Sequence, residues 1–549
     1  MSAPSEESLS ASTLASSTSS INPDPGYQNG DQSSHTTQFG TISRRLSRRL
    51  SLWRPKKRTT VLAVIVATIG SFCLGNVLTW SAPALVDEDF KKKFDTGNGS
   101  WIASLALLGA LFSAPVSGFL IAKIGRRRTM LFTAIPFSIG WFLIAFAPDL
   151  PVLYVGRFLT GFCGGAFTVS VPAYVSEVTE DRIRGTLAVA FILMLCIGIL
   201  FTFVLGALVN WFVLSVVCGC IPIIFFFSML CMPESPRYLV MIQKPTAARN
   251  ALKWLRRAST KRYIEPEISK IENSVTAANG RNNGDSSKVS DLFTLRVLKP
   301  IVISAALMFF AQLSGMNGVS LYTVEIFEEA GTQINAKIAS IIIGATQAIT
   351  VLVVPFVLVE KLGRRSLLII SEVVMCFSLT ALGTYFYLKE QNGGTPPPDL
   401  EWLPLVSLVA ITVGYNVGLG PIPWVLTAEI LPNHVKELAS SCISICYWSL
   451  SFVAGKTFKD IKDVIGYMGV YWLSAGICLF GAFFVFFFVP ETKGRSTDEI
   501  QKLFVTKKEL EEAENTTVQE AKPAESTDGL DNPAFLTPAQ GANANANPV

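Results

Sequence analysis

Long apolar stretches alternate with short polar segments along most of the chain, and this pattern predicts a membrane protein. Twelve of the stretches approach the ~20 residues that an α-helix needs to cross the hydrocarbon core of a bilayer. They divide six and six around a polar segment. The predicted spans are 59–84, 100–122, 129–147, 152–175, 186–208, 211–232, 300–325, 334–358, 366–388, 402–427, 437–460 and 466–489. We therefore expect an all-α membrane protein built from two bundles of six transmembrane helices.

Three polar segments flank the two predicted bundles, which cover residues 59–232 and 300–489. Residues 1–58 have too little apolar surface to offset the entropy of ordering, so we expect a disordered N-terminal tail. Residues 490–549 are predicted to be a C-terminal tail, which we expect to be disordered from about residue 507. The segment 233–299 is predicted to be a linker with short helices, one of them around 247–257. Its middle, 273–288, is rich in Asn, Ser and Gly, and we expect it to lack regular structure.

The composition supports a membrane protein and argues against most other classes. Half of the residues are hydrophobic and only 16% are charged, whereas a soluble domain is about a quarter charged. The ten cysteines lie scattered through apolar stretches without metal-ligand spacing. The sequence has neither a phosphate-binding loop nor a nucleophile–base pair. We therefore expect no enzymatic activity, no cofactor or metal and no nucleic-acid partner.

Lysine and arginine gather in the loops on one side of the predicted helices. They occur in the N-terminal tail, after spans 2, 4 and 8, and in the central segment. The positive-inside rule places both termini in the cytosol, and we expect a multi-pass protein of the plasma membrane. On the outer side, Asn98 begins an Asn-Gly-Ser sequon and is a candidate glycosylation site.

Both tails carry short sequences that regulatory partners recognise. Ser47 and Ser51 each follow an Arg-Arg-Leu triplet, which is typical of substrates of basophilic kinases. The same basic residues also suit a segment held by anionic lipid, and phosphate would cancel that attraction. Residues 531–535 contain Asn-Pro-Ala-Phe, a candidate signal for sorting adaptors.

The seventh span carries polar groups in the middle of an apolar helix. Amides in hydrocarbon must face protein or a water-filled path, because an unpaired amide there costs several kcal/mol. Glycines beside them allow the helix to bend. Amides next to a hinge suggest a site for a neutral, hydroxyl-rich solute, although such amides also serve as contacts between helices. The candidates are Gln312, Asn317 and Tyr322 for binding, and Gly315 and Gly318 for the hinge.

The two halves of the chain repeat a pattern of charges, which favours a parallel repeat with a substrate site between the halves. Gly-Arg-Arg follows both span 2 and span 8, and an acid with a base seven residues later ends both span 4 and span 10. Charges that pair at helix ends could latch one conformation, although each arginine alone could simply anchor the topology. The candidate gating charges are Arg126, Arg127, Arg157, Glu177, Arg184, Glu234, Arg237, Glu360, Arg364, Arg365, Glu429, Lys436, Glu491 and Arg495.

These motifs, taken in order, resemble the sugar porters of the major facilitator superfamily. The resemblance covers about residues 60–500 and also includes Pro-Glu-Ser-Pro-Arg after span 6, Gln-Leu-Ser-Gly-x-Asn in span 7 and Pro-Glu-Thr-Lys-Gly-Arg after span 12. Span 1 is similar to that of insect facilitated trehalose transporters and related glucose facilitators. The resemblance implies alternating access by rocking of the two bundles. It also implies that span 10 bends, at Gly420, Pro421 and Pro423.

The resemblance also implies a sugar site. Gln312 and Asn317 fill the amide positions of span 7, and Trp424 and Trp448 fill those of tryptophans on spans 10 and 11. At several positions where the glucose facilitators carry an amide or a carboxylate, this sequence has a different residue. These residues are Ala311, Phe203, Ala348 (with Gln347 beside it), Asn416 and Tyr447. Fewer hydrogen-bonding groups predict weak glucose binding, and a larger disaccharide or a less polar solute as the substrate.

Two further departures concern the latch and the energy source. The gating motif after span 2 has Ala122 where the family has an aspartate, so the latch is predicted to be uneven. Spans 1 to 5 hold no carboxylate in mid-membrane, where proton-coupled members carry one, and this predicts facilitated diffusion. The alternatives are a proton-coupled sugar or polyol symporter, with Glu372 in span 9 as a carrier, and a non-transporting sugar sensor that signals through its tails.

Overall fold

The computed structural model describes residues 58–94, 97, 99–180, 183–257, 261–282, 294–357, 359–432, 435–495, 499–500 and 503–504. All of them belong to one compact unit that begins at Lys57. The regular structure of these residues is helical throughout.

The first half of the chain forms six long helices. A helix satisfies every backbone N–H and C=O group within itself, which is why apolar stretches without access to water adopt it. Asp87 caps the short α4 by accepting bonds from the backbone N–H groups of Asp89 and Phe90. The elements are α2 (Arg58–Thr79) continued by α3 (Ser81–Ala84), then α4 (Glu88–Lys93), α5 (Gly99–Ile124), α6 (Arg126–Ala145), α7 (Leu150–Val178), α8 (Arg184–Leu208) and α9 (Trp211–Leu230).

The second half contains α13 (Leu295–Leu313), α14 (Met316–Ala330), α15 (Ala336–Val357), α16 (Val359–Leu362), α17 (Arg364–Gln391), the 3₁₀ turn η3 (Pro398–Leu400), α18 (Leu403–Val417), α19 (Ile422–Ile430) and α20 (Lys436–Phe488). α20 has 53 residues, more than twice the ~20 that one crossing needs. Gly466 interrupts it with a φ of 69°. Eleven helices of the described residues are long and apolar enough to cross a membrane, and they match the twelve predicted crossings because α20 is long enough for the last two.

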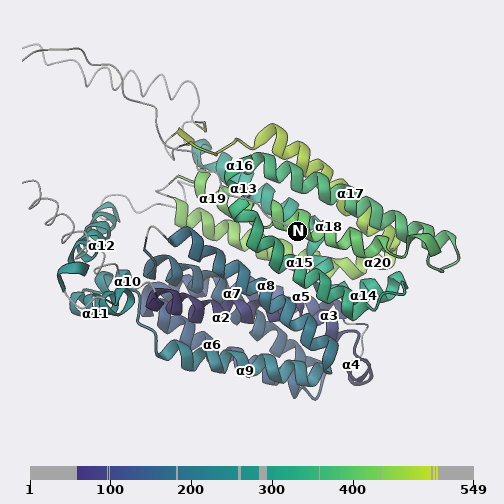
Figure 1. Cartoon of the computed structure of the whole chain (residues 1–549), viewed down its shortest axis with the longest axis horizontal. Helices are drawn as coiled ribbons and strands as arrows, with labels where there is room; N and C mark the ends of the chain where they lie inside the picture. Colours follow the sequence, from purple (N-terminus) through teal and green to yellow (C-terminus); the bar gives the residue numbers. More distant parts are fainter. Residues whose placement is uncertain are drawn as a thin grey trace, which may run out of the picture. The chain divides into compact units, whose positions relative to one another are not determined.

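The two halves pack against each other along two pairs of helices. α5 packs against α20, and α8 packs against α15, while α7 and α2 lie behind them within the first half. In Figure 1 the first half is purple to blue and the second half is green to yellow. We call the end of the helices beside α10–α12 the linker end. The opposite end, where α3, α4 and the C-terminal part of α14 lie, is the far end (Figure 1).

The linker between the halves forms α10 (Pro236–Met241), α11 (Pro245–Arg256) and α12 (Lys261–Asn282). The helix predicted around 247–257 is confirmed. The expectation that 273–288 lacks regular structure is wrong for 273–282, which belong to α12, and the rest of that range lies outside the described residues. Ile264 and Ile268 on α12 pack against Ala248 and Leu252 on α11, and this apolar contact supports the helix in spite of its polar composition.

Arg256 attaches the linker to the first half. Its guanidinium is almost fully buried and pairs with Glu267 at 2.6 Å and with Glu180 at 3.4 Å. It also donates to the main-chain oxygen of Val178 at 2.9 Å and to the hydroxyl of Thr60 at 3.1 Å. The same side chain thus joins α11 and α12 to the linker ends of α2 and α7.

Candidate functional site

Two membrane-spanning segments of the second half are broken near their middles. α13 ends at Leu313 and α14 begins at Met316, and Gly315 between them has a φ of 87°, a conformation that glycine adopts at little cost. The second break separates α18 from α19. Pro421 and Pro423 lie at the start of α19, where a missing N–H costs nothing, so the prolines begin a new helix there instead of bending a continuous one.

Gln312 and Asn317 meet across the first break. The side-chain nitrogen of Asn317 donates to Oε1 of Gln312 at 2.5 Å and to its main-chain oxygen at 3.2 Å. The Gln312 side chain is 1% exposed, and its Nε2 has no hydrogen-bond partner among the described residues. A buried donor without a partner is costly, so an approaching hydroxyl group would be stabilised at this nitrogen.

Aromatic side chains lie beside this amide pair. The hydroxyl of Tyr447 is close to the Gln312 side chain and to Tyr415. The Tyr447 ring contacts Trp424 at 4.9 Å and Trp448 at 5.2 Å between ring centroids, both edge-to-face. Trp424 is 38% exposed and Trp448 is 6% exposed. The site therefore combines amide donors and acceptors with aromatic faces, which suit the C–H surfaces of a sugar ring.

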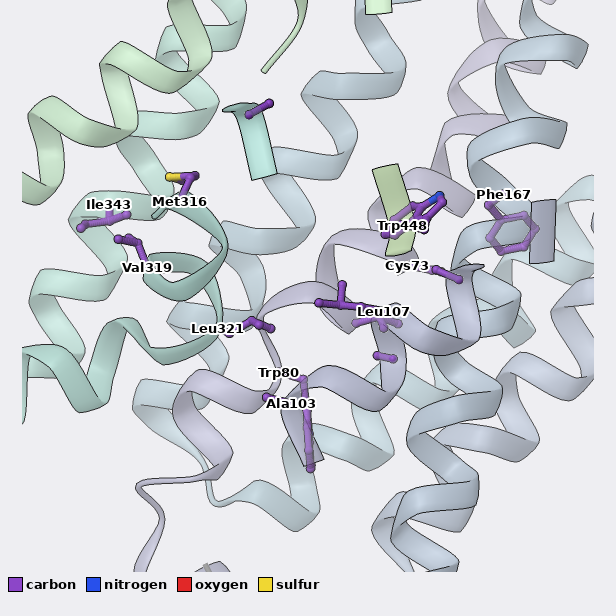
Figure 2. Packing of buried hydrophobic residues seen from close by; sticks show 14 of the residues in the cluster. Cys73, Trp80, Ala103, Leu107, Phe167, Met316, Val319, Leu321, Ile343 and Trp448 are labelled. Carbon is purple, nitrogen blue, oxygen red and sulfur yellow. The ribbon is translucent and has the colours of Figure 1, made fainter. Parts of the chain in front are cut away.

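Two further predicted amides lie on the neighbouring helices α15 and α18. Gln347 is 6% exposed, and its Oε1 has no hydrogen-bond partner in the described part of the chain. Asn416 donates to the main-chain oxygen of Thr412, just before the second break. Figure 2 shows Met316 of α14 next to Ile343 of α15, four residues before Gln347. The contact between α14 and α15 thus brings Gln347 towards the first break.

Phe203 and Tyr322, both predicted to bind substrate, are buried in contacts between helices. Phe203 of α8 packs with Ile199 and Ala82 of the first half and with Val324 of the second. Tyr322 donates its hydroxyl to the main-chain oxygen of Gly455 at 3.1 Å. Its ring stacks on Phe458 at 5.2 Å. A Cβ on Gly318, the second predicted hinge residue, would lie 2.3 Å from the Phe458 ring, so this glycine permits close packing on α20.

Asn76, three residues before the end of α2, is a buried polar residue that was not among the predicted site residues. Its side chain is fully buried, and its Oδ1 accepts a bond from Thr202 of α8 at 3.2 Å. Its Nδ2 has no hydrogen-bond partner within the described ranges. The argument that singled out Gln312, an amide inside an apolar span, applies equally to Asn76.

Arg157 lies about two turns from the start of α7, beside the first turns of α5, and so nearer the far end than the linker end. It is completely buried and donates to the main-chain oxygens of Ile102 at 2.9 Å, Val77 at 3.3 Å and Ala103 at 3.4 Å. Its guanidinium also lies 5.0 Å from the centre of the Trp80 ring. Arg157 therefore joins α2, α5 and α7 into one block, which is a structural role and differs from that of a gating charge at the headgroups.

The predicted gating charges of the first half form a cluster at the linker end. Arg126 pairs with Glu177 at 2.8 Å, and Glu177 accepts a bond from Ser235 at 2.5 Å. Glu234 accepts the backbone N–H of Arg127 at 2.9 Å. The guanidinium of Arg127 reaches two main-chain oxygens at the end of α9. Arg184 donates to the oxygen of Ser176, the residue before Glu177.

The second half repeats this cluster. Arg364 pairs with Glu429 at 2.9 Å, and Glu429 accepts a bond from Thr492 at 2.6 Å. Glu491 accepts the backbone N–H groups of Arg364 and Arg365, each at 3.0 Å. Lys436 donates to the main-chain oxygen of the residue before Glu429, and Arg365 reaches the end of α20. Each acid–base pair lies inside its own half.

Glu491 lies outside the membrane-spanning helices and is held in its charged form. Burial of the carboxyl opposes ionisation. Hydrogen bonds from four backbone N–H groups outweigh the effect of burial and hold the pKa of Glu491 below its usual value of 4.5. The donors are Lys493, Arg364, Arg365 and Thr492.

The remaining predicted residues lie beside these clusters or outside the described part of the structure. Arg237 and Arg495 are exposed at the linker end. Glu360 belongs to α16, but its side chain is outside the described part of the structure, as are Ser47, Ser51 and Asn98 altogether.

The sequence profile of one protein family, "Sugar (and other) transporter", matches residues 59–504. This is most of the chain, and the match includes both halves and the linker.

The chain belongs to this family.

Curated relatives of the family include facilitated trehalose transporters of insects. The chain is 38% identical over 482 residues to facilitated trehalose transporter Tret1 of Polypedilum vanderplanki, with 86% of this chain and 94% of the relative covered. It is also 38% identical over 463 residues to facilitated trehalose transporter Tret1 of Anopheles gambiae, where 83% of this chain but only 58% of the relative is covered. The chain thus spans little more than half of the mosquito relative.

Solved structures of the major facilitator superfamily share the fold. The inward-open xylose transporter XylE from E. coli superposes with a TM-score of 0.67 at 22% identity, covering 80% of this chain and 98% of that one. A second XylE structure, described as a proton:xylose symporter bound to 6-bromo-6-deoxy-D-glucose, superposes with a TM-score of 0.64. It covers 82% of this chain and 99% of that one. The prediction of a twelve-helix fold of this superfamily is confirmed.

Proposed function

We propose that the chain carries a neutral sugar across a membrane by alternating access and facilitated diffusion, with trehalose or a hexose as the substrate. The binding site is formed by Gln312, Asn317, Gln347, Trp424 and Trp448. The two halves rock about this site, and the breaks in the second half allow α14 and α19 to bend during the cycle.

The observation that carries this proposal is a pair of buried amides with unused hydrogen-bonding capacity. Nε2 of Gln312 is a donor without a partner among the described residues, and Oε1 of Gln347 is an acceptor in the same condition. A sugar hydroxyl both donates and accepts, so it can satisfy either atom. A charged substrate would need a charged partner at the site, and Gln312, Asn317 and Gln347 are neutral.

The relatives named as trehalose transporters support a disaccharide, and the aromatic surroundings of Gln312 support it as well. Stacking of sugar C–H surfaces on Trp424 and Tyr447 makes up for hydrogen bonds that a glucose site would have. Glucose offers less surface for stacking, so we expect it to bind more weakly than trehalose.

The lysine and arginine pattern supports an orientation with both termini in the cytosol of a plasma-membrane protein. The linker end is then the cytoplasmic end and the far end is the outer end. The kinase and adaptor partners of the two tails remain part of this proposal.

Counterflow in liposomes tests the function. The purified full chain is reconstituted, the vesicles are loaded with unlabelled trehalose, and entry of labelled trehalose is followed. We expect a transient overshoot that needs no pH gradient and survives an uncoupler, together with weaker competition by glucose. Absence of counterflow with every mono- and disaccharide in a competition panel would refute transport and favour a sensor.

Proton-coupled symport is a second candidate because of Glu372 in α17. Its side chain is fully buried, and neither carboxyl oxygen has a hydrogen-bond partner in the described residues. Gly481 of α20 lies opposite, where a Cβ would be only 2.4 Å from Oε1. Uphill accumulation that an uncoupler abolishes, and that Glu372→Gln converts into downhill transport alone, would favour the symporter over the uniporter.

A further inference from the structure

The two halves meet at the far end through α3, α5, α14 and α20. Ser81 of the first half donates its hydroxyl to the main-chain oxygen of Leu321 of the second half at 3.3 Å. Leu107 and Leu321 converge on Gly455, where a Cβ would lie 3.0 and 2.9 Å from their methyl groups. Figure 2 shows Leu107 and Leu321 next to each other. The far end is therefore closed by direct packing between the halves.

A cation and two aromatic rings lie just beyond this apolar contact. The ammonium group of Lys456 on α20 lies 5.2 Å from the centre of the Trp101 ring in the first turns of α5. The Phe452 ring, one helical turn before Lys456, lies 6.3 Å from Trp101. We call Trp101, Phe452 and Lys456 the far-end latch. Its cation–π contact joins the two halves, and a partly buried lysine strengthens such a contact.

The neighbouring lysines of α20 face acids of their own half. Lys459 pairs with Glu325 of α14 at 2.8 Å. Lys462 lies 3.8 Å from Glu325, 3.5 Å from Asp463 and 5.3 Å from the Tyr467 ring, all within the second half. Lys456 also pairs with Asp460 at 2.7 Å, but that carboxylate is 58% exposed and leaves the cation available to Trp101.

We propose that the far-end latch is a specific gate contact, which holds the far end closed and must break before that end can open. The linker end differs, since Arg126 and Arg364 pair inside their own halves and those pairs survive a separation of the halves. Loss of the latch therefore shifts the population towards the state that is open at the far end. This proposal rests on the alternating-access cycle proposed above.

Hydrogen–deuterium exchange of the full chain in lipid nanodiscs tests the latch without any sugar. Opening of the far end exposes α14 beyond residue 320 and the first turns of α5, so peptides from these segments report it. The variants are Trp101→Leu, which keeps an apolar side chain but removes the ring, Lys456→Met, which keeps the length of the side chain but removes the charge, and the double variant. Lys456→Arg keeps the cation, and Lys462→Met is the matched control because it removes a lysine of the same helix whose charged and aromatic contacts among the described residues lie in the second half.

We expect each single variant to raise the far-end-open population about two- to fivefold, the range that a weak cation–π contact supports. The double variant should match the single variants, Lys456→Arg should match the parent chain, and Lys462→Met should leave exchange unchanged. Equal exchange in Lys456→Met and Lys462→Met, multiplied effects in the double variant, or an Arg variant that behaves like Met would each overturn the latch. Because no sugar is involved, these outcomes are independent of the counterflow result, which alone decides transport.

Discussion

The two halves of the molecule are nearly identical at the linker end and differ in their middles. At the linker end, Glu177 and Glu429 each receive an arginine and a hydroxyl, and Glu234 and Glu491 each accept backbone N–H groups at the start of a helix. In the first half, α2, α5 and α7 run without a break through the middle, and Arg157 ties them together nearer the far end. In the middle of the second half, two spans are broken. Among the described residues, Gln312 and Gln347 there each have one amide atom without a hydrogen-bond partner, whereas the first half has one such amide, Asn76.

The difference assigns separate tasks to the two halves. The shared clusters fix the helix ends of each half, so that each can move as a unit. Arg157 ties three helices of the first half together, whereas two spans of the second half are interrupted. Gly315 and the stretch before α19 provide breaks next to Gln312 and Trp424, so a sugar at the proposed site would contact the helices on both sides of each break.

The largest effect is expected from weakening the tie in the first half by Arg157→Lys. Lysine keeps the charge buried, but its single ammonium cannot reach three carbonyl oxygens on two helices as the guanidinium fork does. We expect the free energy of unfolding to fall by about 2–4 kcal/mol, as measured by SDS titration in mixed micelles. Arg128→Lys, on the exposed side of α6, is the matched control and should change it by less than about 0.5 kcal/mol. Equal losses of unfolding free energy in the two variants would show that Arg157 does not hold α2, α5 and α7 together.

The second effect concerns the amides of the second half. Gln312→Leu keeps the size of the side chain but removes its hydrogen bonds, so we expect about tenfold weaker trehalose binding in a liposome competition assay. Ala311→Gln adds an amide beside the site, and affinity for a small hexose should rise about two- to tenfold. Gln333→Leu, in the exposed loop after α14, should leave both unchanged. If Gln312→Leu lowers stability but not affinity, the amides are contacts between helices and the site lies elsewhere.

Hydropathy alone predicted the twelve crossings, because each apolar stretch must satisfy its own backbone in a membrane. The break at Gly315 was also predictable, since glycines and amides occur together in an otherwise apolar span. The role of Arg157 was not, because its acceptors are main-chain oxygens on two other helices and leave no mark in the sequence. Glu234 and Glu491 were predicted to be gating charges. Each also accepts a backbone N–H group at the start of a helix more than 100 residues earlier in the chain, and such a contact depends on the tertiary fold. The helical structure of 273–282 was not predicted, because the packing that supports α12, of Ile264 and Ile268 on α11, depends on the tertiary fold.

The third prediction compares a glycine at the break between α13 and α14 with a glycine inside the continuous helix α20. Gly315→Ala places a Cβ in a left-handed conformation and 3.2 Å from the Ser474 hydroxyl, so we expect the free energy of unfolding to fall by about 1 kcal/mol and transport to slow. Gly476→Ala, in the second part of α20, meets nothing within 4 Å and should gain up to about 1 kcal/mol from helix propensity. Unfolding and counterflow rates of the two variants provide the comparison. A Gly315→Ala variant that transports normally would show that the bend is fixed during the cycle.

The smallest effect tests whether the two linker-end clusters are equivalent. Glu177→Gln and Glu429→Gln each remove one charge from a partly buried pair, and we expect each to lower the free energy of unfolding by about 0.5–1 kcal/mol. The pairs are matched in distance, at 2.8 and 2.9 Å, but Glu429 is 26% exposed while Glu177 is 11% exposed. Water therefore screens the pair of the second half more, and the loss should be slightly greater for Glu177→Gln. The same titration at two salt concentrations checks this cause, because added salt should reduce the effect of Glu429→Gln more than that of Glu177→Gln. A greater loss of stability for Glu429→Gln than for Glu177→Gln would mean that exposure to water does not set the strength of the two pairs.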